Sequence, residues 1–135
     1  MSRRAILCVD DEAIILLSLV QELKTAFRDQ FIYEKATNAK AAVEIIEDLV
    51  EEGMDLILVI SDWLMPGVKG DEFLDCVCAK SPKIRAIMIT GQADDEAISR
   101  VESKECVLSV IRKPWSPKAL TNLIAEYYSL EYGGD

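Results

Sequence analysis

One stretch in the middle of the chain decides the fold class, and it reads Leu56-Ile57-Leu58-Val59-Ile60-Ser61-Asp62. Its apolar residues follow one another without the alternation of a half-exposed strand, so we expect a strand that is covered on both faces. Four further short runs rich in β-branched residues predict strands at 5–9, 31–36, 86–90 and 107–111. Strands of this kind that alternate with helices indicate a parallel sheet.

Helical periodicity separates and follows the predicted strands. The first helical segment carries an apolar face made of Ala13, Leu16, Leu17, Val20, Leu23 and Phe27. The second follows Asn38 and the last follows Ser116, and both residues are good N-caps. The two helices between them are expected at 70–79 and 94–102, the latter with few apolar residues. We therefore predict an α/β fold of five strand–helix units with right-handed crossovers and helices on both faces of the sheet.

The length and composition bound the organisation and the function. A chain of 135 residues is the size of one compact domain, which we expect over residues 1–128 with a tail at 129–135. The net charge of −9 argues against nucleic-acid binding, because a polyanion would be repelled. The chain has no histidine, which excludes Ser-His-Asp triads and nearly every catalytic zinc site.

The expected location is cytoplasmic, without a membrane segment. No apolar run approaches the roughly 20 residues that span a bilayer, and the start of the chain is too short in apolar residues for a signal peptide. In a reducing compartment the four cysteines, Cys8, Cys76, Cys78 and Cys106, are expected to remain thiols. Cys76 and Cys78 lie two apart in a predicted helix, so they should point to different faces.

Chemically matched residues end four of the five predicted strands. Asp10-Asp11-Glu12 follows the first strand, and Asp62, Thr90 and Lys113 follow the third, fourth and fifth. Each has a simpler interpretation, as a helix-terminal acid, a turn residue or a surface lysine. Ligands of open α/β sheets bind at the carboxyl ends of the strands, where these four segments converge. Their conjunction therefore favours a functional site.

The chemistry that suits these groups is phosphoryl transfer to a carboxylate. Asp11 and Asp62 are hard oxygen ligands of the kind that Mg²⁺ prefers. A carboxylate can attack phosphorus once a metal screens the charges on both partners. Lys113 would add a fixed positive charge, and Thr90 can donate a hydrogen bond to a phosphoryl oxygen.

Over nearly its whole length the sequence resembles the receiver domains of two-component response regulators. The matching motifs are Ile6-Leu7-Cys8-Val9-Asp10-Asp11-Glu12, Asp62-Trp63-Leu64-Met65-Pro66-Gly67-Val68-Lys69-Gly70, Ile89-Thr90-Gly91 and Lys113-Pro114-Trp115. The resemblance implies a flavodoxin-like strand order 2-1-3-4-5 and a cis peptide bond between Lys113 and Pro114.

The resemblance also implies a role for each site residue. Asp62 is expected to be the phosphoacceptor, Lys113 to contact the phosphate and Thr90 to be the switch hydroxyl. Asp10 and Asp11 form the acidic pair, and Mg²⁺ is expected on Asp11, Asp62 and the backbone carbonyl of Leu64. The chain would thus be a signalling switch that modifies only itself and is not an enzyme.

The implied partner is a sensor histidine kinase or phosphotransfer protein, which would supply the histidine in trans. The chain is expected to act on its output through protein contacts with an unidentified partner, and a homodimer on activation is one such contact. Direct nucleic-acid binding is not expected.

One departure from the family pattern concerns the switch residues. The family commonly has Tyr or Phe three residues before the lysine, where this chain has Val110, which puts the usual coupling of the threonine to an aromatic residue in doubt.

Two other functions are compatible with the fold class. A flavodoxin-type electron carrier needs a hydroxyl- and glycine-rich phosphate loop after the first strand, where Asp10-Asp11-Glu12 would repel the cofactor phosphate. An aspartyl-phosphate phosphatase of the haloacid dehalogenase type needs Asp-x-Asp at that place and a cap insertion. Yellow colour or turnover of a phosphatase substrate would distinguish these alternatives.

Overall fold

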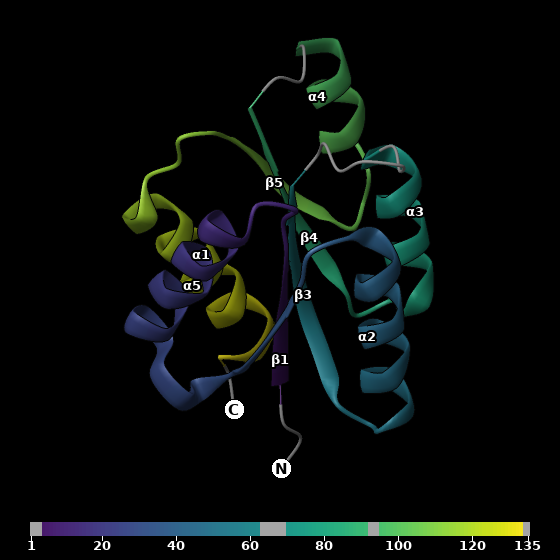
Figure 1. Ribbon diagram of the computed structural model, residues 1–135, viewed down its shortest axis with the longest axis vertical. Helices are drawn as coiled ribbons and strands as arrows, with labels where there is room; N and C mark the ends of the chain where they lie inside the picture. The colour runs from purple at the N-terminus through teal and green to yellow at the C-terminus, as the bar shows by residue number, and fades with distance from the viewer. Residues whose placement is uncertain (1–3, 63–69, 92–94, 134–135) are drawn as a thin grey trace.

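The computed structural model describes residues 4–62, 70–91 and 95–133, and its strands form one parallel sheet in the order β2-β1-β3-β4-β5 (Figure 1). The strands are β1 (Arg4–Val9), β2 (Ile32–Ala36), β3 (Asp55–Asp62), β4 (Arg85–Thr90) and β5 (Val107–Arg112). The helices are α1 (Ala13–Phe27), the short 3-10 helix η1 (Arg28–Gln30), α2 (Ala39–Glu51), α3 (Gly70–Lys80), α4 (Asp95–Glu102) and α5 (Pro117–Tyr132). The expected α/β fold and its strand order are confirmed.

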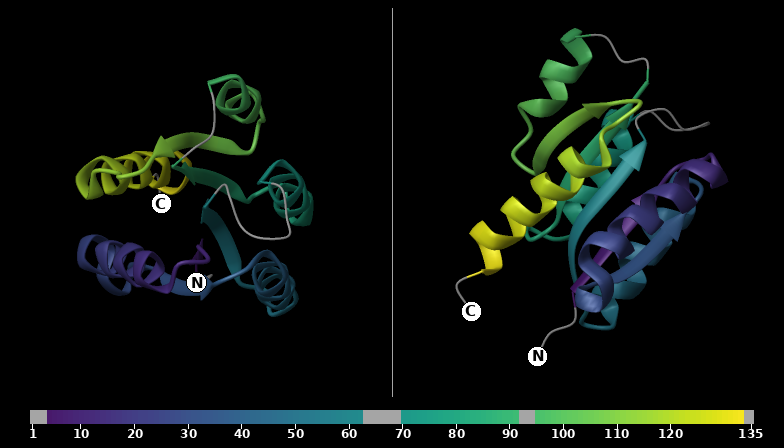
Figure 2. Two further views of the ribbon diagram at one scale, coloured as in Figure 1. Left: turned by 45° about the horizontal axis from the view of Figure 1, so that its top comes forward. Right: turned by 90° about the vertical axis from the view of Figure 1, so that its left-hand side faces the viewer.

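Helices cover both faces of the sheet. Figure 2 shows α1 and α5 on one side and α2, α3 and α4 on the other. The central strand β3 has no exposed face, since every residue from Leu56 to Ile60 is at most 3% exposed. Burying a side chain of this size contributes about 1.5–3 kcal/mol relative to leaving it in water. The sheet therefore acts as a rigid support for the residues that follow its strands.

Two helix starts form as the sequence predicts. The side chain of Asn38 accepts a hydrogen bond from the backbone N–H of Ala41 at 2.7 Å, and the side chain of Ser116 accepts one from Ala119 at 3.2 Å. Each contact satisfies one of the N–H groups that have no partner within the first turn of a helix. Pro117, at the start of α5, loses no bond there because its position would have lacked one in any case.

Two helices differ from the expectation. Leu17 of α1 is 56% exposed, whereas Leu19 is buried, so the apolar face of this helix is rotated from the one that the spacing predicted. The buried stripe is centred on Leu16, Val20 and Leu23, and Leu17 lies beyond its edge. Helix α5 continues to Tyr132 and so includes part of the segment 129–135 that was expected to be a tail.

The expectation that all four cysteines remain thiols is wrong for two of them. Cys78 and Cys106 form a disulfide with their Cα atoms 6.2 Å apart, within the usual range for such bonds. The two residues are 28 positions apart and meet because α3 ends beside the segment that leads into β5. Cys8 and Cys76 are free. Cys76 is exposed and Cys78 half-buried, in line with their expected placement on different faces of the helix.

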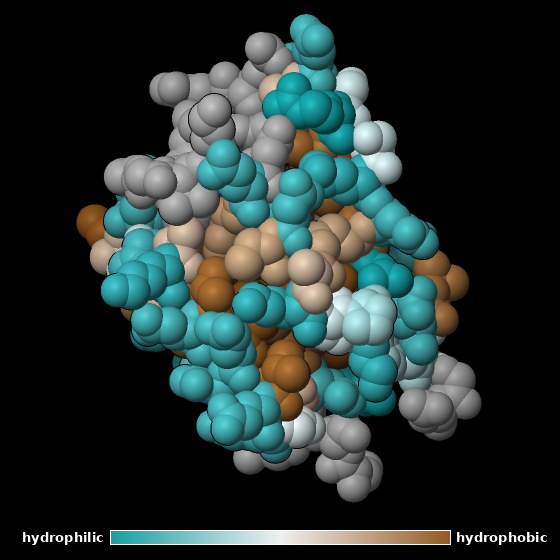
Figure 3. All heavy atoms as spheres, turned by 90° about the vertical axis from the view of Figure 1, so that its right-hand side faces the viewer, coloured by the Kyte–Doolittle hydropathy of each residue, from teal (hydrophilic) through white to brown (hydrophobic). Residues whose placement is uncertain are grey.

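The surface over α2 and α3 is mixed in character. Figure 3 looks onto this side, where hydrophilic side chains cover most of the face and apolar ones are visible between them. Among the described residues, no helix combines the length and the apolar composition that crossing a membrane would require.

Candidate functional site

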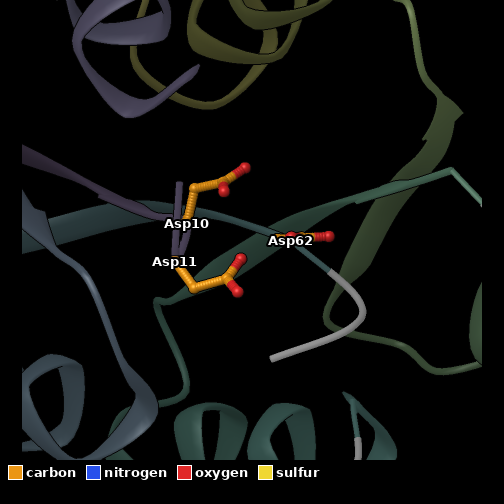
Figure 4. Close-up of side chains that lie close together, drawn as sticks. All are labelled: Asp10, Asp11 and Asp62. Atoms are coloured by element: carbon orange, nitrogen blue, oxygen red, sulfur yellow. The ribbon is translucent and has the colours of Figure 1, made fainter. Parts of the chain in front are cut away.

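Two adjacent strand ends bring three carboxylates together. β1 and β3 pair in parallel with Val9 opposite Ser61, so the residues that follow, Asp10 and Asp62, lie side by side at the carboxyl edge of the sheet. Asp11 comes next in the chain, and carboxylate oxygens of the three aspartates lie within 4.8 Å of one another. Figure 4 shows the three carboxylates turned to the same side. The convergence that the sequence predicted for these residues is present.

The three aspartates differ in their exposure to water. Asp10 is 2% exposed and Asp62 is 6% exposed, whereas Asp11 is an exposed residue. A buried carboxylate loses the hydration of its charge and is stable only where a cation or hydrogen-bond donors replace that hydration. Asp10 and Asp62 therefore need compensation that Asp11 obtains from solvent.

Lys113 supplies the compensating charge. Its Nζ atom lies 3.4 Å from Oδ2 of Asp10 and 3.4 Å from Oδ2 of Asp62. Burial lowers the pKa of Lys113, but the negative charges of Asp62 and Asp10 and the hydrogen bonds to them outweigh burial, so the pKa is raised above its ordinary value. Lys113 is therefore a cation at neutral pH and bridges the ends of β1 and β3.

Backbone contacts hold Asp10 in place from two sides. The N–H group of Glu12 donates a hydrogen bond to Oδ1 of Asp10 at 2.8 Å, and the N–H group of Asp10 donates one to the carbonyl oxygen of Ala36 at 3.2 Å. The first bond leaves Oδ2 directed to Lys113. The orientation of the Asp10 carboxylate is thus determined before any ligand binds.

Thr90 lies at the end of β4, next to the strand that carries Asp62. It is 0% exposed, and its carbonyl oxygen accepts a hydrogen bond from the N–H group of Lys113 at 2.7 Å. The residue predicted to report on a phosphoryl group therefore has its backbone bonded directly to the predicted phosphate-contacting lysine. The peptide bond between Lys113 and Pro114 is cis, as the resemblance implied.

The charge and donor types of the site fit a divalent cation. The three carboxylates carry three formal negative charges and Lys113 one positive charge, so these four residues together carry a formal charge of −2. Mg²⁺ binds one or two carboxylates together with waters and phosphate oxygens, and the exposed Asp11 leaves the cluster open to solvent on one side. The expected carbonyl ligand, Leu64, lies outside the described residues.

A supporting contact near the site was not predicted. The indole N–H of Trp115 donates a hydrogen bond to Oε1 of Glu22 at 2.7 Å and so ties the loop after β5 to α1. The two residues are 93 positions apart, and no pattern in one sequence could have paired them. A pocket of about 500 Å³ adjoins this contact and is lined by Ile15, Glu22, Gly91, Lys113, Pro114 and Trp115.

The position expected to carry a switch aromatic lies in an apolar environment. Val110 of β5 is half-buried and packs against a cluster that joins α3, α4 and β4. The buried members of this cluster, here called the α4 cluster, are Leu74, Ala86, Met88 and Val101. Val110 is therefore part of the packing beneath α4.

Comparisons with known proteins agree on the family. A family model described as the response regulator receiver domain matches residues 6–125. The chain is 30% identical over 121 residues to the sensor kinase CckA of Brucella abortus (strain 2308) and 31% identical over 121 residues to the hydrogenase transcriptional regulatory protein HoxA of Cupriavidus necator. These alignments cover 90% of this chain but only 12% and 23% of the two relatives.

A solved structure matches the whole chain. The response regulator receiver domain protein (CheY-like) from Methanospirillum hungatei JF-1 is 27% identical, with a TM-score of 0.81 over 99% of this chain and 100% of that one. The chain thus corresponds to one complete receiver structure and to less than a quarter of each curated relative.

Proposed function

Since this chain belongs to the response regulator receiver family and is a phosphoacceptor signalling switch of two-component systems, we propose that Asp62 is the residue that takes up the phosphoryl group. One observation carries this assignment. Lys113 lies at 3.4 Å from both Asp62 and Asp10, in a cluster whose three carboxylates lie within 4.8 Å of one another. The family resemblance places the acceptor at the end of the third strand, which is Asp62 here, whereas Asp10 has its Oδ1 bonded to the N–H group of Glu12.

The reaction is a displacement at phosphorus. An oxygen of the Asp62 carboxylate attacks the phosphorus atom of a phosphohistidine on a partner protein, the P–N bond breaks and the donor imidazole leaves. The 135 residues include no histidine, so the donor histidine lies outside them or is replaced by a small phosphodonor. Lys113 is positioned to neutralise part of the charge that three phosphoryl oxygens bring to the buried end of β3.

Receiver domains bind Mg²⁺ at an acidic pocket, and we assign that pocket here to Asp10, Asp11 and Asp62, with the carbonyl of Leu64 as the further ligand. Bound Mg²⁺ would screen the repulsion between the attacking carboxylate and the phosphoryl oxygens. Asp10 uses Oδ1 for the N–H group of Glu12 and Oδ2 for Lys113, so we take Asp11 and Asp62 as the direct ligands, as the family resemblance implies. Asp10 then acts mainly by orienting that lysine.

Thr90 is the proposed link between the phosphoryl group and the surface. Thr90 ends β4, the strand that pairs with β3 and so lies beside Asp62, where its hydroxyl could donate a hydrogen bond to a phosphoryl oxygen. On the other side it pairs with Arg112 of β5. Because an aliphatic residue, Val110, occupies the usual aromatic position, we propose that the signal passes through the α4 cluster and α4. The phosphorylated chain would then act through protein contacts on the surface around α4, one of which is a homodimer formed on activation.

The proposed partner upstream is a sensor histidine kinase or a phosphotransfer protein. The chain would catalyse only its own phosphorylation and dephosphorylation, and no turnover of an external substrate is expected. Neither alternative with the same fold class gains support from the site. The carboxylates at the end of β1 would repel a flavin phosphate, and Asp10-Asp11 lacks the Asp-x-Asp spacing of the phosphatases.

The assignment is tested by labelling with acetyl phosphate. We expect the intact mass to rise by one phosphoryl group in the presence of Mg²⁺, and not in the presence of a chelator. Asp62→Asn should abolish the increase, because an amide oxygen is a far weaker nucleophile than a carboxylate oxygen.

A matched control lies on the same strand. Asp55 begins β3 at its opposite end, so Asp55→Asn changes the same residue type in the same strand and should be labelled as the wild type is. Labelling of Asp62→Asn at the wild-type rate, or loss of labelling in both variants, would refute Asp62 as the acceptor.

A further inference from the structure

A second pair of reactive groups lies at the end of the sheet opposite to the aspartates. Cys78, near the end of α3, and Cys106, directly before β5, are joined as a disulfide with their Cα atoms 6.2 Å apart. The carbonyl oxygen of Cys106 accepts a hydrogen bond from Ala86, the second residue of β4, at 2.8 Å. The cysteine pair therefore lies where β4 and β5 begin, whereas the aspartates lie beyond the carboxyl ends of their strands.

A salt bridge beside the pair holds the same two segments together without a covalent bond. Nζ of Lys104 lies 2.7 Å from Oδ1 of Asp75. Asp75 is three residues before Cys78 and therefore shares its side of α3, and Lys104 is two residues before Cys106. Because this contact does not involve sulfur, it does not depend on the disulfide, although a pair as exposed as this one contributes little to stability.

The cysteine pair lies beside an open groove on the surface. Both cysteines are half-buried and line an open groove of about 430 Å³, whose wall also includes Arg85, Lys104 and Glu105. The other two cysteines do not share this setting. Cys76 is exposed, and Cys8 is 0% exposed inside β1, where burial raises the pKa of its thiol to about 12.

We propose that Cys78 and Cys106 form a reversible dithiol–disulfide site that exchanges with a small disulfide of the glutathione type in this groove. One thiolate of the pair displaces one thiol from the small disulfide and forms a mixed disulfide, which the second thiolate then resolves. Two electrons pass from the pair to the small disulfide, and the two protons of the pair end on the two small thiols released. Reduction follows the same steps in reverse.

The bond has a structural consequence for α4. Cys78 and Cys106 pack against the α4 cluster, which includes Val101 of α4, and Lys104 follows that helix directly. Helix α4 has only two buried side chains, Ile98 and Val101, so the segment that leads from it into β5 is one of its main attachments. The closed disulfide fastens this segment to α3 covalently, and in the open form the salt bridge between Lys104 and Asp75 and the apolar packing remain.

The first test counts thiols in the folded chain. The protein is equilibrated with reduced and oxidised glutathione in varied ratio, free thiols are alkylated, and the intact mass gives their number. We expect two thiols to disappear together as the oxidised fraction rises, peptide mapping to join Cys78 to Cys106, and dithiothreitol to restore both thiols without denaturant. The proposal would be overturned if all four thiols were alkylated at every ratio of reduced to oxidised glutathione, or if the disulfide could be reduced only in denaturant.

Two variants separate this pair from the other cysteines. Cys76→Ser changes a cysteine of the same helix two residues away and should keep the paired loss of thiols. Cys78→Ser should abolish it. Should Cys78→Ser fail to fold, the thiol count and peptide map of the wild type still decide the outcome.

The second test measures the effect on α4 by hydrogen exchange. Amides of residues 95–106 should exchange several-fold more slowly in the oxidised wild type than in the reduced one, and Cys78→Ser should exchange at the reduced rate in both buffers. Equal rates in oxidised and reduced wild type would overturn the claim that the bond restrains α4. Neither test involves Asp62, so failure here leaves the proposed phosphorylation site unaffected.

Discussion

At the carboxyl end of the sheet, Lys113 holds Asp10 and Asp62 by ionic contacts of 3.4 Å, whereas at the amino end a covalent bond joins Cys78 to Cys106. The first arrangement depends on charge, so we expect it to respond to metal, phosphate and pH. The second depends on the oxidation state of sulfur. On the two proposals above, the ends respond to different chemical conditions and share the same sheet, and their structural effects would meet at α4. The following experiments test how independent the two ends are.

Opening the disulfide should have the largest effect on stability. The bond joins residues 28 positions apart, and closing a loop of that length reduces the entropy of the unfolded chain by an amount worth about 3.6 kcal/mol. Urea unfolding with and without dithiothreitol measures the difference. Cys78→Ser should resemble the reduced wild type under both conditions, and Cys76→Ser should resemble the wild type. A reduced protein as stable as the oxidised one would contradict this prediction.

Mg²⁺ should produce the next largest effect. A ligand that binds only the folded state, at a concentration 100-fold above its Kd, raises the free energy of unfolding by about 2.7 kcal/mol. Asp11→Ala should remove most of this increase, since Asp11 is an exposed member of the carboxylate cluster. Asp48→Ala, which removes an exposed acid from α2, is the matched control and should respond to Mg²⁺ as the wild type does.

The same titration compares the two ends directly. If they are thermodynamically independent, the stabilisation by Mg²⁺ should be equal in the oxidised and the reduced protein. An increase that differs between the two forms would show that the disulfide and the metal site are coupled.

Replacing Lys113 should destabilise the metal-free protein by about 2 kcal/mol, because Lys113→Met removes the cation that contacts two buried carboxylates. The expected loss of stability is smaller than for a fully buried ion pair, since the lysine side chain is 20% exposed. The effect should depend on pH. The pKa of Lys113 is raised in the folded state, so its contribution is complete below the ordinary lysine pKa and is lost as the pH rises through the folded value. Lys113→Met should therefore converge with the wild type in strongly alkaline solution.

Urea unfolding in a chelator at neutral and alkaline pH measures both effects. Lys118→Met is the control, since Lys118 is an exposed lysine of α5. An equal loss of stability in the two variants would contradict a specific role for Lys113 between the aspartates.

The smallest effect is expected at the contact between Trp115 and Glu22. Trp115→Phe keeps an aromatic ring but removes the N–H group that donates at 2.7 Å, which should cost about 1 kcal/mol. Glu22→Gln keeps an acceptor oxygen and should cost less. If both variants are as stable as the wild type, the contact does not stabilise the loop after β5.

The cluster of site residues at the ends of the strands could be predicted from the sequence, but the contacts between distant loops and helix ends could not. Asp10, Asp62 and Lys113 each follow an apolar strand, and a parallel sheet brings such positions to one edge whatever the loop lengths are. The pairing of Cys78 with Cys106 depends on where α3 ends and how the chain turns into β5, and nothing local to either residue encodes that distance. The exposure of Leu17 was missed because the spacing of apolar residues does not fix the rotation of a helix to within one position.

The hydrogen bond from the N–H group of Lys113 to the carbonyl oxygen of Thr90, 2.7 Å long, bears on how quickly the switch can respond. It joins the ends of β4 and β5, so the backbones that carry Lys113 and Thr90 have a fixed spacing, and the contacts of Lys113 with Asp10 and Asp62 hold its side chain. Two separately mobile groups would each lose conformational freedom on binding, whereas a prearranged pair loses little. On the proposed roles of Lys113 and Thr90, the phosphoryl group would bind to a backbone arrangement that is already formed, at a small cost in conformational entropy.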